Sequence, residues 1–167
     1  MVRKFVVQGA PVPKARPRIT RQGRAYTPKR TQEYEERVKT SYIEKYGHIA
    51  VSEMQPLAVE MRFYVPIPKS WSKKKHKMAV VGKIKPTTRP DIDNYIKAIL
   101  DSLNNGIAYV DDSCVCDINA SKRYSEKPRT VISITEIEDE NKEEEATSES
   151  QEESRAEAMA RYDCQSH

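Results

Sequence analysis

The chain has 167 residues and a formal net charge of +4. This length suits one domain with its own apolar core, and no apolar run reaches the ~20 residues that a membrane-spanning helix needs. The charge is unevenly distributed, because residues 1–137 carry 26 Lys and Arg against 14 Asp and Glu, whereas residues 138–167 carry 3 against 11. A domain with a net charge of +12 attracts polyanions, chiefly nucleic acids or anionic membrane surfaces.

The three cysteines favour a reducing compartment. Cys114, Cys116 and Cys164 form an odd and sparse set, which fits free thiols better than a secreted disulfide scaffold. Residues 1–10 lack an apolar segment long enough for a signal peptide, so we expect a cytoplasmic protein with no membrane partner. Cys114 and Cys116 are two residues apart, which on a strand places both on one face, and we expect them to pack rather than to bind a metal.

The chain begins with a predicted strand and a basic loop. Residues 2–8 are rich in β-branched and aromatic side chains, and Gly9 and the prolines after it end the strand. Residues 14–30 alternate basic, proline and small polar residues, which predicts an extended loop. Its candidate contacts to a polyanion are Lys14, Arg16, Arg18 and Arg24.

A helix and a second strand follow. Thr31 and the acidic stretch after it are typical of a capped helix start with favourable charges in the first turn. Apolar residues then recur at helical spacing until a plausible stop at Gly47: Tyr34, Val38, Tyr42 and Ile43. Residues 56–65 alternate between apolar and polar side chains, which predicts a half-buried strand.

Residues 66–90 contain prolines and a dense group of lysines that includes Lys73, Lys74 and Lys75. This composition fits either a mobile loop or a short helix flanked by loops. The segment could be a solvated linker. Its closeness in sequence to the acidic cluster described below favours an arm that faces the substrate.

The last part of the domain combines a helix with two strands. A helix is predicted over residues 92–103, where Ile and Leu recur at helical spacing before Asn-Asn-Gly. Residues 114–124 and 129–137 alternate around a short turn, which predicts a β-hairpin. The order βαβαββ predicts a small α+β (mixed α/β) domain over residues 1–137, with a mixed sheet and packed helices. Residues 138–167 have few large apolar side chains, which predicts a disordered acidic tail.

The most specific chemistry lies between residues 89 and 112. Asp91 and Asp93 stand at the predicted start of the second helix, and Asp112 precedes the next strand. If the helix packs beside that strand, the three carboxylates could meet and hold Mg²⁺, a hard cation that prefers oxygen ligands. Lys97 lies at i+4 from Asp93 on one helix face and could offset charge on a phosphate.

Simpler roles exist for the same residues. Asp91 alone fits a helix N-cap, and Asp93 with Lys97 fits a surface ion pair. With those roles the chain would be a non-catalytic, basic DNA-binding protein. The three histidines are scattered, so the sequence supports neither a histidine-based nuclease nor a zinc site.

The run Arg-Pro-Asp-Ile-Asp-Asn-Tyr-Ile-Lys-Ala-Ile-Leu-Asp-Ser-Leu-Asn at residues 89–104, followed by Asp111-Asp112-Ser113, resembles the signature of the RusA family of Holliday junction resolvases. The likeness extends to the Pro13–Arg18 loop, the Tyr26–Pro28 segment and the Ser72–Lys75 arm. It therefore covers residues 2–137 and leaves only the tail outside.

The resemblance implies a small mixed α/β fold and an endonuclease that depends on Mg²⁺, with Mn²⁺ as a possible substitute. Such an enzyme cuts four-way DNA junctions as a homodimer in DNA recombination and repair, in a bacterial or phage-infected cell. Carried over by position, Asp91, Asp93 and Asp112 would bind the metal, Lys97 would be the catalytic lysine, and Arg89 would contact DNA. Asp101 and Asp111 match acidic positions with supporting roles. A flap or fork is the alternative branched substrate.

Overall fold

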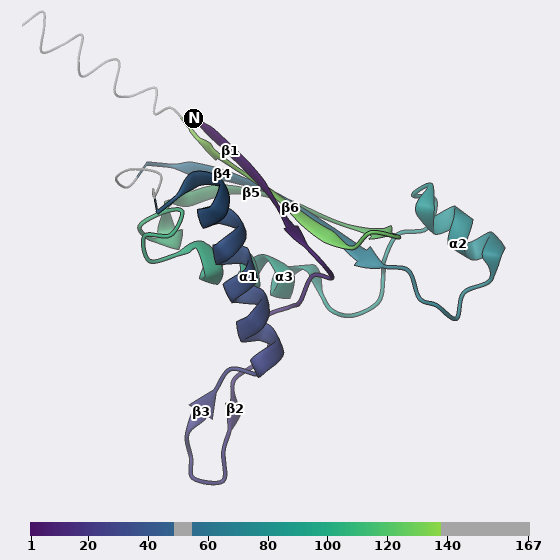
Figure 1. Cartoon of the computed structure of the whole chain (residues 1–167), viewed down its shortest axis with the longest axis horizontal. Helices are drawn as coiled ribbons and strands as arrows, with labels where there is room; N and C mark the ends of the chain where they lie inside the picture. Colours follow the sequence, from purple (N-terminus) through teal and green to yellow (C-terminus); the bar gives the residue numbers. More distant parts are fainter. Residues whose placement is uncertain (49–54, 138–167) are drawn as a thin grey trace, which may run out of the picture. The chain divides into compact units, whose positions relative to one another are not determined.

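The computed structural model describes residues 1–48 and 55–137 (Figure 1). The disordered tail predicted over residues 138–167 lies outside the described residues. Within the described part of the chain, no helix is both long and apolar enough to cross a membrane.

A four-stranded mixed sheet is the framework of the fold. Its strands are β1 (Val2–Gln8), β4 (Leu57–Pro66), β5 (Val115–Ser125) and β6 (Arg129–Glu136), in the spatial order β1-β6-β4-β5. β6 is antiparallel to β1 and β4, and β5 is parallel to β4. A parallel pair needs a long crossover, and the chain between β4 and β5 provides it. The predicted mixed sheet and the order of its main elements are confirmed.

Three α-helices accompany the sheet: α1 (Lys29–Tyr46), α2 (Lys73–Val80) and α3 (Ile92–Leu103). Of the two alternatives for residues 66–90, a mobile loop or a short helix flanked by loops, the structure shows the short helix, α2. The basic loop over residues 14–30 contains a small hairpin, β2 (Arg18–Ile19) with β3 (Ala25–Tyr26), which the sequence pattern did not indicate.

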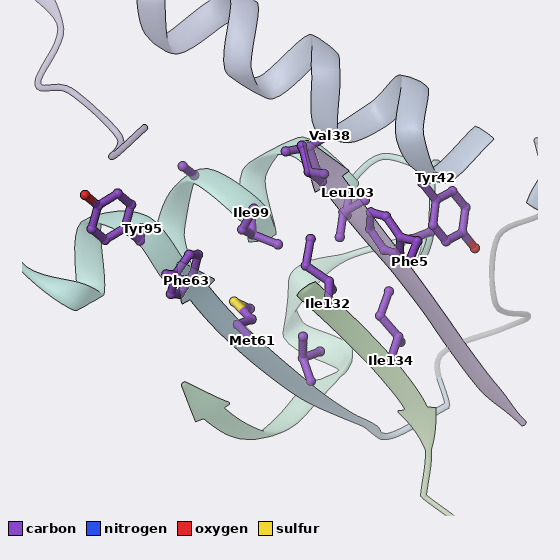
Figure 2. Packing of buried hydrophobic residues seen from close by; sticks show 14 of the residues in the cluster. Phe5, Val38, Tyr42, Met61, Phe63, Tyr95, Ile99, Leu103, Ile132 and Ile134 are labelled. Atoms are coloured by element: carbon purple, nitrogen blue, oxygen red, sulfur yellow. The ribbon is translucent and has the colours of Figure 1, made fainter. Parts of the chain in front are cut away.

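Helices α1 and α3 pack on the same face of the sheet and form the core with it (Figures 1 and 2). The predicted inward residues of β4 are all buried: Leu57, Val59, Met61 and Phe63. In α3 the buried residues include Tyr95, Ile99 and Leu103, so this helix turns its opposite side to solvent. That orientation leaves Asp93 and Lys97 exposed.

The predicted hairpin of β5 and β6 is wrong. A short turn joins these strands in sequence, but β4 lies between them and pairs with both. The turn passes the end of β4 at Pro66, where proline has no N–H to extend the pairing. Alternation identifies two strands, but it does not determine which strands become neighbours.

Helix α1 begins two residues before the predicted cap. Its N-cap is Pro28, which makes no side-chain capping bond, and no acid lies in the first turn. Thr31, the predicted start, is buried within the helix, and its N–H donates to the Pro28 carbonyl at 2.9 Å. The predicted end at Gly47 is confirmed, because Gly47 is the C-cap with φ of 72°.

The expectation that Cys114 and Cys116 share one face is also wrong. Cys114 is buried in the short 3-10 helix η1 (Asp112–Cys114), whereas Cys116 is exposed in β5. The register shifts here, since Leu57 pairs with Val115 and Ala58 pairs with Asp117. Cys116 is thus an extra residue that breaks the alternation of the strand.

Candidate functional site

The first turn of α3 presents two exposed carboxylates. Asp91 is the N-cap residue with extended backbone (φ −71°, ψ 152°), but its side chain makes no capping hydrogen bond. Asp93 lies in the first turn, and its Oδ1 accepts a hydrogen bond of 3.1 Å from the side-chain amide of Asn94. The positive end of the helix dipole favours negative charge at this place. Both carboxylates therefore retain oxygen lone pairs for a cation.

Lys97 lies one turn after Asp93 on the exposed side of α3. The i,i+4 spacing places the two side chains on one face. Among the ion pairs of the described residues, none joins Asp93 to Lys97. The surface ion pair considered from sequence is therefore not formed, and the ammonium group is exposed beside the carboxylate pair.

Asp112 belongs to a different element. It is the first residue of η1, just before β5, and it is exposed. Burial raises the pKa of Tyr109, and the charges of Asp112 and Asp101 raise it further. The Tyr109 hydroxyl donates to the carbonyl of Leu100 at 3.0 Å, which ties the loop before η1 to α3.

The three predicted metal ligands do not form one cluster in the described residues. No group of three or more His, Cys, Asp or Glu side chains within residues 1–48 and 55–137 is arranged to hold a metal ion. Asp91 and Asp93 still offer a donor set that suits Mg²⁺. This ion is commonly held by one or two carboxylates, and water and substrate phosphate complete its shell.

The two other acids of the signature have local partners. Asp111 Oδ1 accepts the backbone N–H of Ser113 at 2.9 Å at the start of η1. Hydrogen bonds from the side chain and then the backbone of Ser113 lower the pKa of Asp111. Asp101 forms an ion pair of 2.7 Å with Lys14. These contacts show that Asp111 holds the start of η1 and that Asp101 holds Lys14 against α3.

Lys122 holds the segment that leads into α3. Its Nζ donates to the carbonyls of Thr88 and Pro90, both at 2.9 Å. Arg89 lies between these two bonded carbonyls, and its side chain is exposed. The β5 strand thereby fixes the backbone on both sides of Arg89 and directly before Asp91. No local pattern marks Lys122 in the sequence, because its role depends on the approach of a distant loop.

Lys14 differs from the other predicted DNA contacts. Its Nζ lies 2.6 Å from Glu35 Oε1 of α1 and 2.7 Å from Asp101 Oδ2 of α3, and its side chain is 23% exposed. Burial lowers the pKa of Lys14, but the hydrogen bonds to Asp101 and Glu35 outweigh it, so that the net pKa is raised. Two carboxylates already neutralise this ammonium group, so it joins elements of the fold together.

The remaining predicted basic contacts are exposed and lie in three places. Arg16, Arg18 and Arg24 belong to the β2–β3 hairpin or the loop before it, Lys73, Lys74 and Lys75 form the first turn of α2, and Arg89 precedes α3. Figure 1 shows the hairpin beyond the first turn of α1 and α2 beyond the end of β4. Two basic projections thus extend from the body of the sheet and helices.

Aromatic contacts hold the α2 segment. Lys75 Nζ lies 4.0 Å from the centre of the Trp71 ring, and Trp71 meets Tyr124 of β5 edge to face at 5.0 Å. Ser72 caps the helix by accepting the N–H of Lys75. The lysines of α2 are therefore presented by an ordered element, and Lys75 is held more closely than its neighbours.

Comparison with known proteins agrees with these features. The family described as Endodeoxyribonuclease RusA matches residues 8–135, a range that includes α1, α3 and η1. A protein of Bacillus subtilis (strain 168), named Uncharacterized protein YqaN, is 38% identical over 144 residues. The alignment covers 80% of this chain and 96% of the relative.

Proposed function

The chain belongs to the RusA endodeoxyribonuclease family, and we propose that it cuts four-way DNA junctions with Mg²⁺ as its cofactor. The single observation that carries this proposal is the pair of exposed carboxylates at the start of α3. Asp91 has the position of a cap without a capping bond, and Asp93 has no ion pair with Lys97. Two exposed carboxylates that keep oxygen lone pairs for a cation, one helical turn from a lysine on a basic domain, fit phosphodiester hydrolysis.

Asp91 and Asp93 would hold the cation in this proposal, and Asp112 is the third ligand expected from the family pattern. A bound Mg²⁺ supplies Lewis-acid polarisation of a phosphate oxygen and a more acidic water. Lys97 lies one helical turn from Asp93 and can neutralise charge that develops on the scissile phosphate. It does so as a fixed cation, with no need to transfer a proton.

The basic projections would bind the DNA backbone. Contacts from arginine and lysine to phosphates fix the position of a duplex without reading its sequence. The proposed contacts are Arg16, Arg18, Arg24, Lys73, Lys74, Lys75 and Arg89. Lys14 is omitted, because its ammonium group is engaged by Glu35 and Asp101.

A homodimer fits the symmetry of the proposed substrate. A four-way junction has approximate two-fold symmetry, and paired nicks need two equivalent active sites. A two-fold dimer with one acidic site in each subunit satisfies this need. Such cutting would serve DNA recombination and repair in a bacterial or phage-infected cell.

The proposal is tested by comparing four-way junction, replication fork and linear duplex DNA as substrates, each with and without Mg²⁺. We expect paired nicks in the junction, only with the metal. Faster cutting of the fork would identify a nuclease for other branched DNA. Binding without nicks in any substrate would identify a non-catalytic DNA-binding protein and contradict the proposal.

A further inference from the structure

A cavity of about 340 Å³ lies beside the start of α3. Its walls come from the loop after β1, the first turn of α1, the end of β4, the segment before α3 and strand β5. Arg89 and Pro90 line it, and Asp91 is the next residue in the chain. The volume is at the lower end of the roughly 300–1,000 Å³ of small-molecule sites, so it suits one nucleotide and excludes a duplex.

The walls combine rigid apolar groups with positive charge. Six prolines line the cavity, at positions 11, 13, 66, 68, 86 and 90. Their fixed rings make a wall that needs little ordering when a ligand binds. The charged lining residues are Arg30, Arg89 and Lys122, and no described residue that lines the cavity is acidic. A planar apolar group with an attached anion matches this lining.

Two tyrosines supply aromatic surface. Tyr95 stacks on Phe63 with ring centres 5.2 Å apart, and Figure 2 shows its hydroxyl pointing away from the rest of the core cluster. Tyr95 and Arg30 line the same cavity. Tyr124 is held by Trp71. Tyr95 is 4% exposed and forms part of the wall, whereas the half-buried Tyr124 offers a fixed aromatic surface of the kind on which nucleobases stack.

Hydrogen bonds fix two walls of the cavity. Lys122 donates to the carbonyls of Thr88 and Pro90, which keeps the segment before α3 against β5. On the opposite wall, the N–H of Lys14 donates to the carbonyl of Asn94 at 2.7 Å and fixes the loop after β1 to α3. One wall is therefore bonded to the first turn of α3, and the other to the segment that leads directly into Asp91.

We propose that this cavity receives one unpaired nucleotide of the DNA strand that is cut, with its base among the prolines and tyrosines and its phosphate near Arg30 and Arg89. The inference rests on the proposed nuclease function and adds a site that selects which phosphate reaches Asp91. Removing a base from a duplex costs unstacking energy, and that cost is least where pairing is already interrupted, as it is at a branch point. Binding an unpaired nucleotide in this cavity would therefore favour branched DNA over a duplex, and it would also determine which phosphodiester bond reaches Asp91.

Two variants with matched controls test the proposal. Thr88→Phe adds a ring inside the cavity and retains the Thr88 carbonyl that Lys122 binds, whereas Thr87→Phe adds the same ring at the exposed neighbouring position outside the lining. Arg30→Gln removes a lining charge, whereas Lys29→Gln removes an exposed charge that does not line this cavity. The second pair keeps the test valid if Thr88→Phe fails to fold.

The first measurement is binding of deoxynucleoside 5′-monophosphates, followed through the amide NMR signals of Arg89 and Tyr95. We expect shifts with the wild type and both controls, and their loss with Thr88→Phe and Arg30→Gln. Inorganic phosphate serves as the comparison ligand. Equal shifts with phosphate alone, or unchanged nucleotide shifts in Thr88→Phe, would overturn the nucleotide site.

The second measurement is the rate of junction cleavage with each of the four bases placed in turn at the positions next to the cut. We expect the wild type to prefer some bases by about tenfold or more, as a shaped pocket allows. Thr88→Phe should still cut with that preference abolished, and Thr87→Phe should retain it. A wild type without preference, or a Thr88→Phe enzyme with the wild-type preference, would overturn the inference and leave the nuclease function standing. Nucleotide binding without cutting of any DNA would support the site and overturn the nuclease function.

Discussion

Lys14 Nζ and Asp101 Oδ2 lie 2.7 Å apart and join the loop after β1 to α3. The same ammonium group reaches Glu35 of α1 at 2.6 Å, so one side chain connects three elements that are far apart in sequence. The Lys14 side chain is 23% exposed, Glu35 18% and Asp101 30%. This bridge fixes α3 against α1 and thus the position of the carboxylates at its start.

Lys14→Met should destabilise the fold by leaving two half-buried carboxylates without their cation. An exposed ion pair contributes ~0.2–1 kcal/mol, and breaking a buried pair costs ~3–5 kcal/mol. Because this bridge is half-buried, we expect the free energy of unfolding, measured with denaturant, to fall by about 1–2 kcal/mol. Lys29→Met is the control, since Lys29 is 88% exposed and 3.7 Å from Glu33. Equal effects of the two substitutions would contradict the bridging role.

We expect the folded protein to lose stability in alkaline solution because of the buried Tyr34 hydroxyl. Its hydroxyl is buried and 2.7 Å from Thr130 Oγ1, and burial raises the pKa of Tyr34 from 10.0 to about 12. Because the folded-state pKa is above the unfolded-state value, this contribution is complete below pH 10 and is lost as the pH rises towards 12. Tyr34→Phe should cost about 1–2 kcal/mol at neutral pH, since Thr130 loses its partner. The difference from the wild type should shrink between pH 10 and 12, and a constant difference there would refute this explanation.

Lys122→Met should release the segment that precedes Asp91. Both hydrogen bonds to the Thr88 and Pro90 carbonyls would be lost. The Asp91 carboxylate could then shift, and a misplacement of a reacting group by about 1 Å can reduce an enzymatic rate by ~10²-fold. We expect kcat for junction cleavage to fall and the Mg²⁺ concentration for half-maximal activity to rise, with junction affinity within a few-fold of the wild type. Lys127→Met, an exposed lysine on the turn after β5, is the control. A change in affinity alone would show that Lys122 is only a DNA contact.

Arg24→Gln in the β2–β3 hairpin should weaken binding to all DNA forms alike. A phosphate contact adds about 0.9 to the slope of log affinity against log salt, so the slope should fall by roughly one. Arg62→Gln is a matched control, because Arg62 is exposed on β4 and already paired with Glu60 at 2.5 Å. An unchanged slope in Arg24→Gln would exclude this residue from the DNA surface.

Helix α3 shows what local sequence can predict. The predicted range, 92–103, is the observed range, because apolar residues at helical spacing are followed by Asn104-Asn105-Gly106. Asn105 and Gly106 have positive φ, as a helix end of this kind requires. The exposure of Asp93 and Lys97 follows from that pattern, since the buried face of the helix fixes its opposite face.

The arrangement around α3 depends on contacts between distant segments. The strand pattern of β5 and β6 does not reveal that β4 separates them. Lys14 and Lys122 look like ordinary basic residues in sequence, and their carboxylate or carbonyl partners arrive only through the fold. For the same reason the predicted meeting of Asp112 with Asp91 and Asp93 could not be derived from spacing. In the described residues these three acids form no metal cluster.

The most direct test of the central claim is single-turnover cleavage of a synthetic four-way junction by Asp91→Asn and Asp93→Asn, beside Asp112→Asn and the exposed control Asp117→Asn. Each asparagine keeps the shape of the side chain and removes its charge. We expect Asp91→Asn and Asp93→Asn to bind the junction like the wild type and to lose cleavage by at least ~10²-fold, as expected when metal-dependent charge stabilisation is lost. Asp112→Asn should share that loss if Asp112 is the third ligand, and Asp117→Asn should cut normally. Undiminished cleavage by both Asp91→Asn and Asp93→Asn would contradict the assignment of the active site.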